Sequence, residues 1–293
     1  MSSLFKKTVR NPRSSRSGGF LFGKSLFEKH AMTDDSSTEN SLFTNPLVYQ
    51  LPYAGNVREG ISYADDARIF DLYLPEKTEA PAPVVVLVTG YPDAGFEERL
   101  GMKQMQIQAF KDWAKLLAAS GMAAVIYSNV EPVEDAFKLL EFLRCEAQQL
   151  QIDSERIAVW SCSGSVPNAI NVLHKDSAVR CAALLYGFML DSAGSCVLQE
   201  TAQAIGFANP HDGMKNFPEN TPILVIRAGK DEFSGLNDSI DNFEREAVAR
   251  NCPVSVISYP EGVHAFDILD DSRRSVEMIK LCVGFLRLRL NVY

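Results

Sequence analysis

An unbroken apolar run, Val84-Val85-Val86-Leu87-Val88, ends directly at Thr89-Gly90. Four of its five residues are β-branched, and such a run is typical of a strand buried on both faces of a sheet. Strands of this kind occur in parallel sheets that helices cover on both sides. The run therefore restricts the chain to the α/β class of folds.

Short apolar runs and amphipathic segments alternate along the rest of the chain. The predicted strands are 67–74, 84–88, 122–127, 157–160, 181–185, 223–226 and 254–259. The predicted helices are 104–119, 133–150, 166–174, 236–250 and 272–289. This alternation indicates a mostly parallel sheet with helices on both faces. Functional groups of such sheets lie beyond the carboxyl ends of the strands, so the residues after each strand are the ones to inspect.

Charge divides the chain into a basic tail and an acidic body. Residues 1–31 carry seven basic residues and one acidic residue, which leaves 22 basic and 36 acidic residues in 32–293. An acidic body argues against a nucleic-acid-binding surface, because phosphate neutralisation needs clustered Lys and Arg. No apolar run approaches the ~18 residues that a membrane span needs. We expect residues 1–44 to form a disordered basic and polar tail, and residues 45–293 to form one domain.

Three interpretations of the tail stay open. Its Ser- and Arg-rich, acid-poor composition resembles an organellar transit peptide. The alternatives are a solvated extension, or translation that starts at Met32.

The six cysteines lack zinc-site spacing and predict reduced thiols in a cytoplasmic protein.

The strand predicted at 157–160 runs into Ser161-Cys162-Ser163-Gly164-Ser165, and a helix follows. A nucleophile on a tight strand-to-helix turn needs small residues two positions before and after it, because larger side chains would collide with the flanking elements. Ser163 meets this condition, with serines at the two positions that usually hold glycine. The start of the helix adds N–H groups and a positive dipole end that suit a developing oxyanion. A serine cluster that caps a structural helix is the alternative.

Cys162 is the rival nucleophile, since a thiolate attacks better than a hydroxyl. Gly164 lies two positions after Cys162 and fits the turn, but Trp160 lies two positions before it and is too large. The spacing therefore favours Ser163.

A serine hydroxyl needs a base, and the base needs an acid that orients it. His264 is placed on a loop between a predicted core strand and the final helix. Asp231 follows the strand 223–226 and is the predicted acid, with Glu232 as the second choice. The predicted triad is Ser163, Asp231 and His264, in the chain order expected on this kind of sheet. A structural histidine and a turn aspartate are the alternatives.

An oxyanion hole needs two backbone donors. The N–H group of Gly164, directly after the nucleophile, is one. The loop after strand 84–88 should supply the other. Pro92 has no N–H, so Tyr91 is the natural donor, and Gly90 would let the backbone approach the substrate closely.

Four motifs carry a resemblance to a known superfamily. They are Thr89-Gly90-Tyr91, Ile152-Asp153-Ser154-Glu155-Arg156-Ile157, Ala228-Gly229-Lys230-Asp231-Glu232 and Gly262-Val263-His264-Ala265-Phe266-Asp267. With them the sequence resembles the α/β-hydrolase superfamily, and within it the dienelactone-hydrolase-like serine esterases. The resemblance implies a three-layer α/β-hydrolase fold, with a mostly parallel sheet of about eight strands. It also implies ester hydrolysis by an acyl-enzyme route, and the spacing from Arg156 to Ser163 is similar to that of the superfamily.

The sequence departs from these relatives in three respects. Ser161 and Ser165 replace the glycines beside the nucleophile, and Thr89 stands where many relatives have His. Dienelactone hydrolases proper usually have a Cys nucleophile, whereas the spacing here selects Ser163.

We therefore expect a serine hydrolase that cleaves a small carboxylic ester or lactone, with no cofactor or metal. Its partner would be the small-molecule ester, and the sequence leaves its oligomeric state open. One alternative is a non-catalytic hydrolase-fold protein that binds a small ligand. Another is a peptidase, thioesterase or amidase on the same scaffold. The segment 190–220, with Phe207, Met214 and Phe217, is interpreted either as a small lid or as an ordinary surface excursion.

Overall fold

The computed structural model describes residues 43–76, 81–191, 195–210, 215 and 217–293. The predicted tail, except for residues 43 and 44, lies outside this part of the chain. In the described ranges, no helix combines the length and apolar character needed to cross a bilayer. The division at residue 44 stays a prediction.

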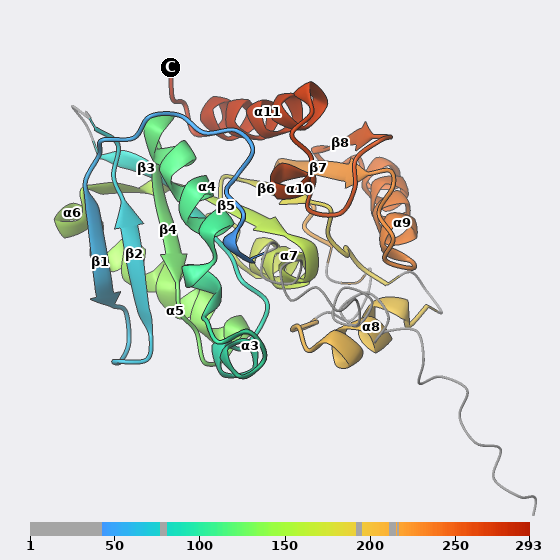
Figure 1. Ribbon diagram of the computed structural model, residues 1–293, viewed down its shortest axis with the longest axis horizontal. Helices are drawn as coiled ribbons and strands as arrows, with labels where there is room; N and C mark the ends of the chain where they lie inside the picture. The colour runs from blue at the N-terminus through green and yellow to red at the C-terminus, as the bar shows by residue number, and fades with distance from the viewer. Residues whose placement is uncertain (1–42, 77–80, 192–194, 211–214, 216) are drawn as a thin grey trace, which may run out of the picture.

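An eight-stranded sheet forms the centre of the molecule, in the order β1-β2-β4-β3-β5-β6-β7-β8 (Figure 1). Its strands are β1 Val57–Ser62, β2 Ile69–Tyr73, β3 Ala82–Leu87, β4 Ala123–Tyr127, β5 Ile152–Cys162, β6 Cys181–Leu185, β7 Ile223–Ala228 and β8 Val254–Tyr259. The strand β2 pairs antiparallel with both β1 and β4, and every other pairing is parallel. The predicted mostly parallel α/β sheet is thus confirmed.

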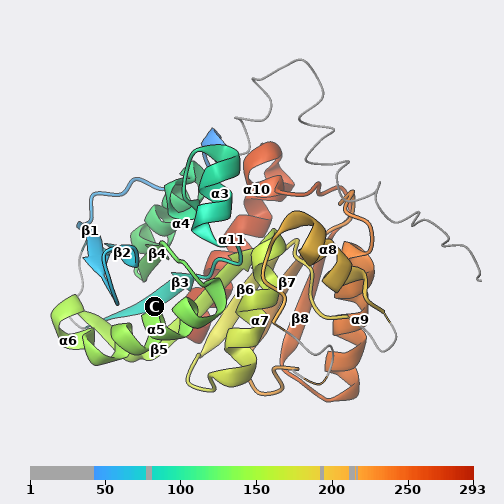
Figure 2. The ribbon, with the colours of Figure 1, turned by 90° about the horizontal axis from the view of Figure 1, so that it is seen from below.

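Helices cover both faces of this sheet. They are α3 Asp93–Leu100, α4 Gln108–Ala119, α5 Pro132–Cys145, α6 Ala147–Leu150, α7 Val166–Lys175, α8 Val197–Ile205, α9 Leu236–Ala249, α10 Phe266–Leu269 and α11 Arg273–Arg289. Figure 2 shows α4 and α11 on one face, and α5, α7 and α9 on the other. Side chains alternate along β3, so Val84 and Val86 join the core under α5, α7 and α9. Val85 and Leu87 join the core under α4 and α11.

The seven predicted strands and five predicted helices are all present, with two kinds of difference. The helix predicted at 133–150 is divided at Glu146 into α5 and α6. The strand β1 and the helices α3, α8 and α10 were not predicted. The strand β1 is an edge strand whose register shifts near Gly60, which has a φ of 67°, so its alternation is interrupted. The others have at most nine residues, too few for a clear helical period.

Parallel pairing brings the carboxyl ends of six strands, β3 to β8, to one edge. Leu87 of β3 pairs with Trp160 of β5, and Cys162 of β5 pairs with Leu185 of β6. On the far side of β6, Ala228 of β7 pairs with Tyr259 of β8. The loops that follow these strands therefore meet, although they lie far apart in sequence.

Candidate active site

Ser163 lies on a sharp turn between β5 and α7. Its φ is 54°, in the left-handed region that a residue with a Cβ rarely adopts. The residues Ser163–Ser165 form a short 3-10 helix that leads directly into α7. This strained strand-to-helix turn is the conformation expected of a nucleophile elbow.

The two serines that replace glycine tie this turn to the loop after β3. Ser161 Oγ donates to the carbonyl oxygen of Val88 at 3.0 Å, and the Gly90 N–H donates to Ser165 Oγ at 3.0 Å. Both serines are buried. A Cβ on Gly90 would lie 2.7 Å from the Gly164 carbonyl oxygen and from the Ser165 Cα. Gly90 therefore permits a close approach to the turn itself, and the predicted close approach to a substrate stays a prediction.

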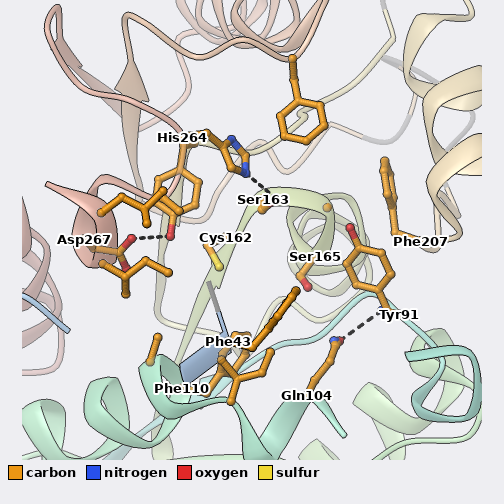
Figure 3. A pocket seen from close by; sticks show the side chains of 18 of the residues that line it. Phe43, Tyr91, Gln104, Phe110, Cys162, Ser163, Ser165, Phe207, His264 and Asp267 are labelled. Atoms are coloured by element: carbon orange, nitrogen blue, oxygen red, sulfur yellow. Dashed lines mark hydrogen bonds between the residues drawn. The ribbon is translucent and has the colours of Figure 1, made fainter. Parts of the chain in front are cut away.

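The three residues of the predicted triad meet at the carboxyl edge of the sheet. Ser163 Oγ lies 2.9 Å from His264 Nε2 (Figure 3), and His264 Nδ1 lies 2.6 Å from Asp231 Oδ2. The Asp231 side chain is fully buried, and its Oδ1 accepts the Phe233 N–H at 3.0 Å. With the Asp231 carboxylate accepting from Nδ1, the imidazole presents an unprotonated Nε2 to the serine hydroxyl. Glu232, the second choice for the acid, is exposed.

Cys162 also lines the pocket, but its environment keeps the thiol protonated. Burial raises the pKa of Cys162 well above its ordinary value, and the nearby Asp267 carboxylate raises it further. Only the thiolate is a good nucleophile, so this environment favours Ser163 over Cys162.

Of the two predicted oxyanion donors, Gly164 lies on the turn itself and Tyr91 lies on the loop after β3. The Gly164 N–H belongs to the first turn of the helix, where N–H groups have no partner within the helix. The Tyr91 N–H donates at 3.4 Å to Gln104 Oε1 (Figure 3). The Tyr91 N–H is thus already directed at an oxygen atom, which sequence reasoning did not anticipate.

A cavity of about 440 Å³ opens over Ser163. Six phenylalanine rings line it: Phe43, Phe96, Phe110, Phe188, Phe207 and Phe233. Among the described residues of the lining, Lys230, Glu232 and Asp267 carry formal charges. Lys230 forms an ion pair with Glu261. The volume is in the range of small-molecule sites, and the lining is mostly apolar.

The segment interpreted as a lid has separate parts. Phe207 lines the cavity, and the Ala208 N–H donates to the Gly90 carbonyl oxygen at 2.7 Å. Phe217 lies elsewhere, stacked on Phe243 with ring centroids 4.5 Å apart. Met214 lies outside the described residues, and a lid function stays a prediction.

Sequence reasoning missed two polar residues of the site. Tyr186 directly follows the predicted strand 181–185, and the residues after each strand are those in which functional groups are expected. Asp267 lies three residues after His264 and is 1% exposed.

In the described part of the chain, no three His, Cys, Asp or Glu side chains are grouped as metal ligands would be. All six cysteines are free thiols.

Comparisons with known proteins agree with this fold. The model of the dienelactone hydrolase family matches residues 148–278, which include Ser163, Asp231 and His264. No curated protein sequence matches the chain significantly. A dienelactone is a cyclic ester, so the family match confirms the predicted class of enzyme, a hydrolase that acts on ester bonds.

Solved structures of esterases are similar to the chain. A bacterial heroin esterase is 14% identical with a TM-score of 0.62, over 83% of this chain and 87% of its own. A thermostable carboxylesterase cloned from a metagenomic library is 19% identical with a TM-score of 0.63, over 83% and 92%. A hyperthermophilic esterase from the archaeon Pyrobaculum calidifontis is 17% identical with a TM-score of 0.61, over 81% and 86%. At these identities the likeness shows the fold alone. The chain is thus an α/β-hydrolase-fold protein that resembles the dienelactone hydrolase family over residues 148–278.

Proposed function

We propose that the chain is a serine hydrolase that cleaves a small carboxylic ester or lactone through an acyl-enzyme intermediate. The observation that carries this proposal is the hydrogen-bonded series Ser163–His264–Asp231 at the floor of an apolar cavity. A serine, a histidine and a buried carboxylate in this order form the arrangement that activates a hydroxyl for acyl transfer.

In the first half-reaction, His264 Nε2 takes the proton of Ser163 as Oγ bonds to the carbonyl carbon. The carbonyl oxygen becomes an oxyanion, held by the N–H groups of Gly164 and Tyr91, each of which lowers the barrier by about 3 kcal/mol. The Tyr91 N–H leaves Gln104 Oε1 and turns to the oxyanion at this step. The bond to the leaving oxygen then breaks, and the protonated His264 donates its proton to that oxygen. The alcohol departs, and Ser163 carries the acyl group.

In the second half-reaction, water attacks the acyl carbon while His264 Nε2 takes a proton from the water. The bond to Ser163 Oγ breaks, and Oγ recovers its proton from His264. Asp231 keeps its charge throughout, and it stabilises the imidazolium formed in each half-reaction. The acid is released, and the enzyme returns to its starting state.

The cavity supports a neutral, apolar ester as the substrate. Apolar groups gain by leaving water among the six phenylalanine rings. A substrate carboxylate would meet Glu232 and Asp267, while Lys230 is already paired with Glu261. We therefore expect 4-nitrophenyl butyrate to be hydrolysed with a higher kcat/KM than the 4-nitrophenyl monoester of succinic acid. A preference for the anionic ester would contradict this part of the proposal.

Labelling with a fluorophosphonate probe tests the proposed chemistry. Wild type should label, and Ser163→Ala should not. Equal labelling of the two proteins, or none of either, would reject the serine hydrolase and leave the small-ligand binder. Rates on an aryl ester and on the matching anilide then separate ester from amide hydrolysis, and faster anilide turnover would overturn the esterase proposal.

The proposal places the enzyme in the cytoplasm, with a small-molecule ester as its partner. Six unpaired thiols support a reducing compartment. Fractionation of cells that express the full chain tests this location, and enrichment in an organelle would favour the targeting interpretation of the tail.

A further inference from the structure

A second carboxylate lies in the site, and the proposed triad does not use it. Asp267 lines the cavity and is almost completely buried. The Tyr186 hydroxyl donates to Asp267 Oδ1 at 2.6 Å, and the Trp113 indole N–H donates to Oδ2 at 2.8 Å. Burying a carboxylate costs stability unless donors compensate it, and here each oxygen has its own donor.

These bonds favour the ionised form of Asp267. An indole N–H can only donate, and the tyrosine hydroxyl donates as well, so both carboxylate oxygens act as acceptors. Burial is the larger influence and leaves the pKa of Asp267 above its ordinary value, while the hydrogen bonds from Tyr186 and Trp113 counter part of that rise. The Cys162 thiol is a further hydrogen-bond partner of the Tyr186 hydroxyl. Burial and the charge of Asp267 raise the pKa of Tyr186, so its hydroxyl stays protonated and able to donate.

Tyr186 in turn packs on the base of the proposed triad. Its ring centroid lies 5.0 Å from that of His264, at an interplanar angle of 65°. The Phe233 ring packs on the same imidazole at 4.7 Å and 63°. Tyr186 itself has a φ of 34°, a strained conformation for a non-glycine residue at the end of a buried strand. Strain of this kind persists only where the surroundings impose it, and here the ring is placed directly against the imidazole.

The imidazole needs such support because it lies on a loop. His264 is followed by Ala265, which has a φ of 55°, and the His264 side chain is 20% exposed. Its ring must keep Nε2 on Ser163 and Nδ1 on Asp231 at the same time, and a rotation of the ring breaks both contacts. The bond from Tyr186 to Asp267 joins the residue after β6 to α10, which directly follows the loop that carries His264, across 81 residues of sequence.

We propose that Asp267 and Tyr186 are positioning residues of this site. Asp267 holds the Tyr186 hydroxyl, and the Tyr186 ring then holds the His264 imidazole in line with both Ser163 and Asp231. The consequence for turnover rests on the proposed serine hydrolase function. The positioning of the imidazole does not, because it is a property of the protein without substrate.

The chain offers a matched control. Tyr259, at the end of β8, donates through its hydroxyl to Asp270, three residues after Asp267. This pair has the same chemistry and lies on the neighbouring segment, but neither residue lines the cavity. Tyr259→Phe therefore removes a tyrosine–carboxylate hydrogen bond and leaves the contacts between Asp267, Tyr186 and His264 unchanged.

The test is proton NMR of the full chain. The His264 Nδ1–H proton should give a far-downfield resonance, because it takes part in the short hydrogen bond to Asp231. Wild type and Ser163→Ala should show this resonance, and His264→Asn should lose it. In Tyr186→Phe we expect the resonance to broaden or move and kcat on an aryl ester to fall about tenfold, with KM within about twofold. Tyr259→Phe should change neither. A Tyr186→Phe spectrum and kcat like those of Tyr259→Phe would overturn the inference.

A second measurement separates positioning from general stability. Asp267→Asn should reduce kcat at least as much as Tyr186→Phe, and the double variant should lose no more than Asp267→Asn alone, since both act through one bond. Additive losses would reject the shared role. If Asp267→Asn fails to fold, Tyr186→Phe still decides, because it keeps the ring. If wild type shows the resonance but takes no fluorophosphonate label, the proposed function fails while the inference about the imidazole stands.

Discussion

The amide of Gly90 donates a 3.0 Å hydrogen bond to Ser165 Oγ, joining the loop after β3 to the turn that carries Ser163. This bond should hold the Tyr91 N–H at its place in the proposed oxyanion hole. We expect Ser165→Ala to lower the free energy of unfolding by about 1 kcal/mol and kcat by about tenfold, with little change in KM. Urea denaturation and steady-state kinetics measure both effects.

Ser120→Ala is the control for this prediction. Ser120 Oγ donates to the Leu116 carbonyl oxygen at 2.7 Å, on the end of α4 and outside the cavity. Its loss should affect stability alone. Equal kcat values for Ser165→Ala and Ser120→Ala would show that the tie at Ser165 has no part in turnover.

The choice between the two neighbouring nucleophiles is open to a direct test. Ser163→Ala should reduce kcat on the order of 10⁶-fold, whereas Cys162→Ala should keep most activity. Because burial raises the pKa of the Cys162 thiol, it stays protonated at pH 8, and we expect iodoacetamide to leave the activity of folded enzyme intact. The reverse pattern in the two variants would move the nucleophile by one residue.

The acid of the triad can be distinguished from its exposed neighbour. Asp231→Asn removes the charge that fixes the imidazole tautomer, so we expect kcat to fall by about 10⁴-fold without a large change in stability. Glu232→Gln should stay within about threefold of wild type, because Glu232 is exposed and the carboxylate that accepts from His264 Nδ1 belongs to Asp231. A larger loss in Glu232→Gln than in Asp231→Asn would exchange the two roles.

Gly164 has room for no side chain. A Cβ there would contact the Tyr91 hydroxyl and lie 2.8 Å from Phe207 Cδ1. We expect Gly164→Ala to displace the Tyr91 ring and reduce kcat/KM at least about tenfold. Gly95→Ala in α3, where a Cβ meets nothing within 4 Å, serves as the control. Full activity in Gly164→Ala would contradict this prediction. It would show that the Tyr91 and Phe207 rings can move away from the new methyl group without displacing the oxyanion donors.

The bond from Tyr91 to Gln104 predicts a less usual outcome. If Gln104 Oε1 only occupies the Tyr91 N–H until substrate arrives, Gln104→Met should raise kcat/KM or leave it within about threefold, since a competing acceptor is removed. A loss of more than about tenfold would instead show that the Gln104 amide group itself assists the reaction. Steady-state kinetics on one aryl ester distinguish these results.

The order of strands and helices was predictable from their hydrophobic patterns. Each core strand is a short, continuous apolar run, and most of the longer helices show apolar residues at helical spacing. The residues of the triad were predictable for a related reason. Each directly follows a strand or its turn, and parallel pairing collects such positions at one edge. The site roles of Ser163, Asp231 and His264 stay proposals until the variants are measured.

Other contacts could not be predicted because sequence does not state which distant segments meet. Asp267 finds Tyr186 across 81 residues and Trp113 across 154, and neither spacing forms a motif. Gln104 begins a 3-10 helix, Gln104–Gln106, that follows α3, and its side chain returns to the Tyr91 N–H across 13 residues. The serines at 161 and 165 looked like departures from a motif, since their acceptor and donor lie more than 70 residues earlier in the chain.

The 2.7 Å bond from the Ala208 amide to the Gly90 carbonyl oxygen links the cavity wall to the loop that presents Tyr91. A bulky substrate that pushes Phe207 outward would also pull on that loop. A crowded cavity would then displace the Tyr91 N–H that stabilises the oxyanion. The rate of the chemical step would fall, and the effect would not be limited to substrate binding. Selectivity for substrate size in this protein should accordingly appear as slower chemistry of oversized esters, with their affinity largely retained.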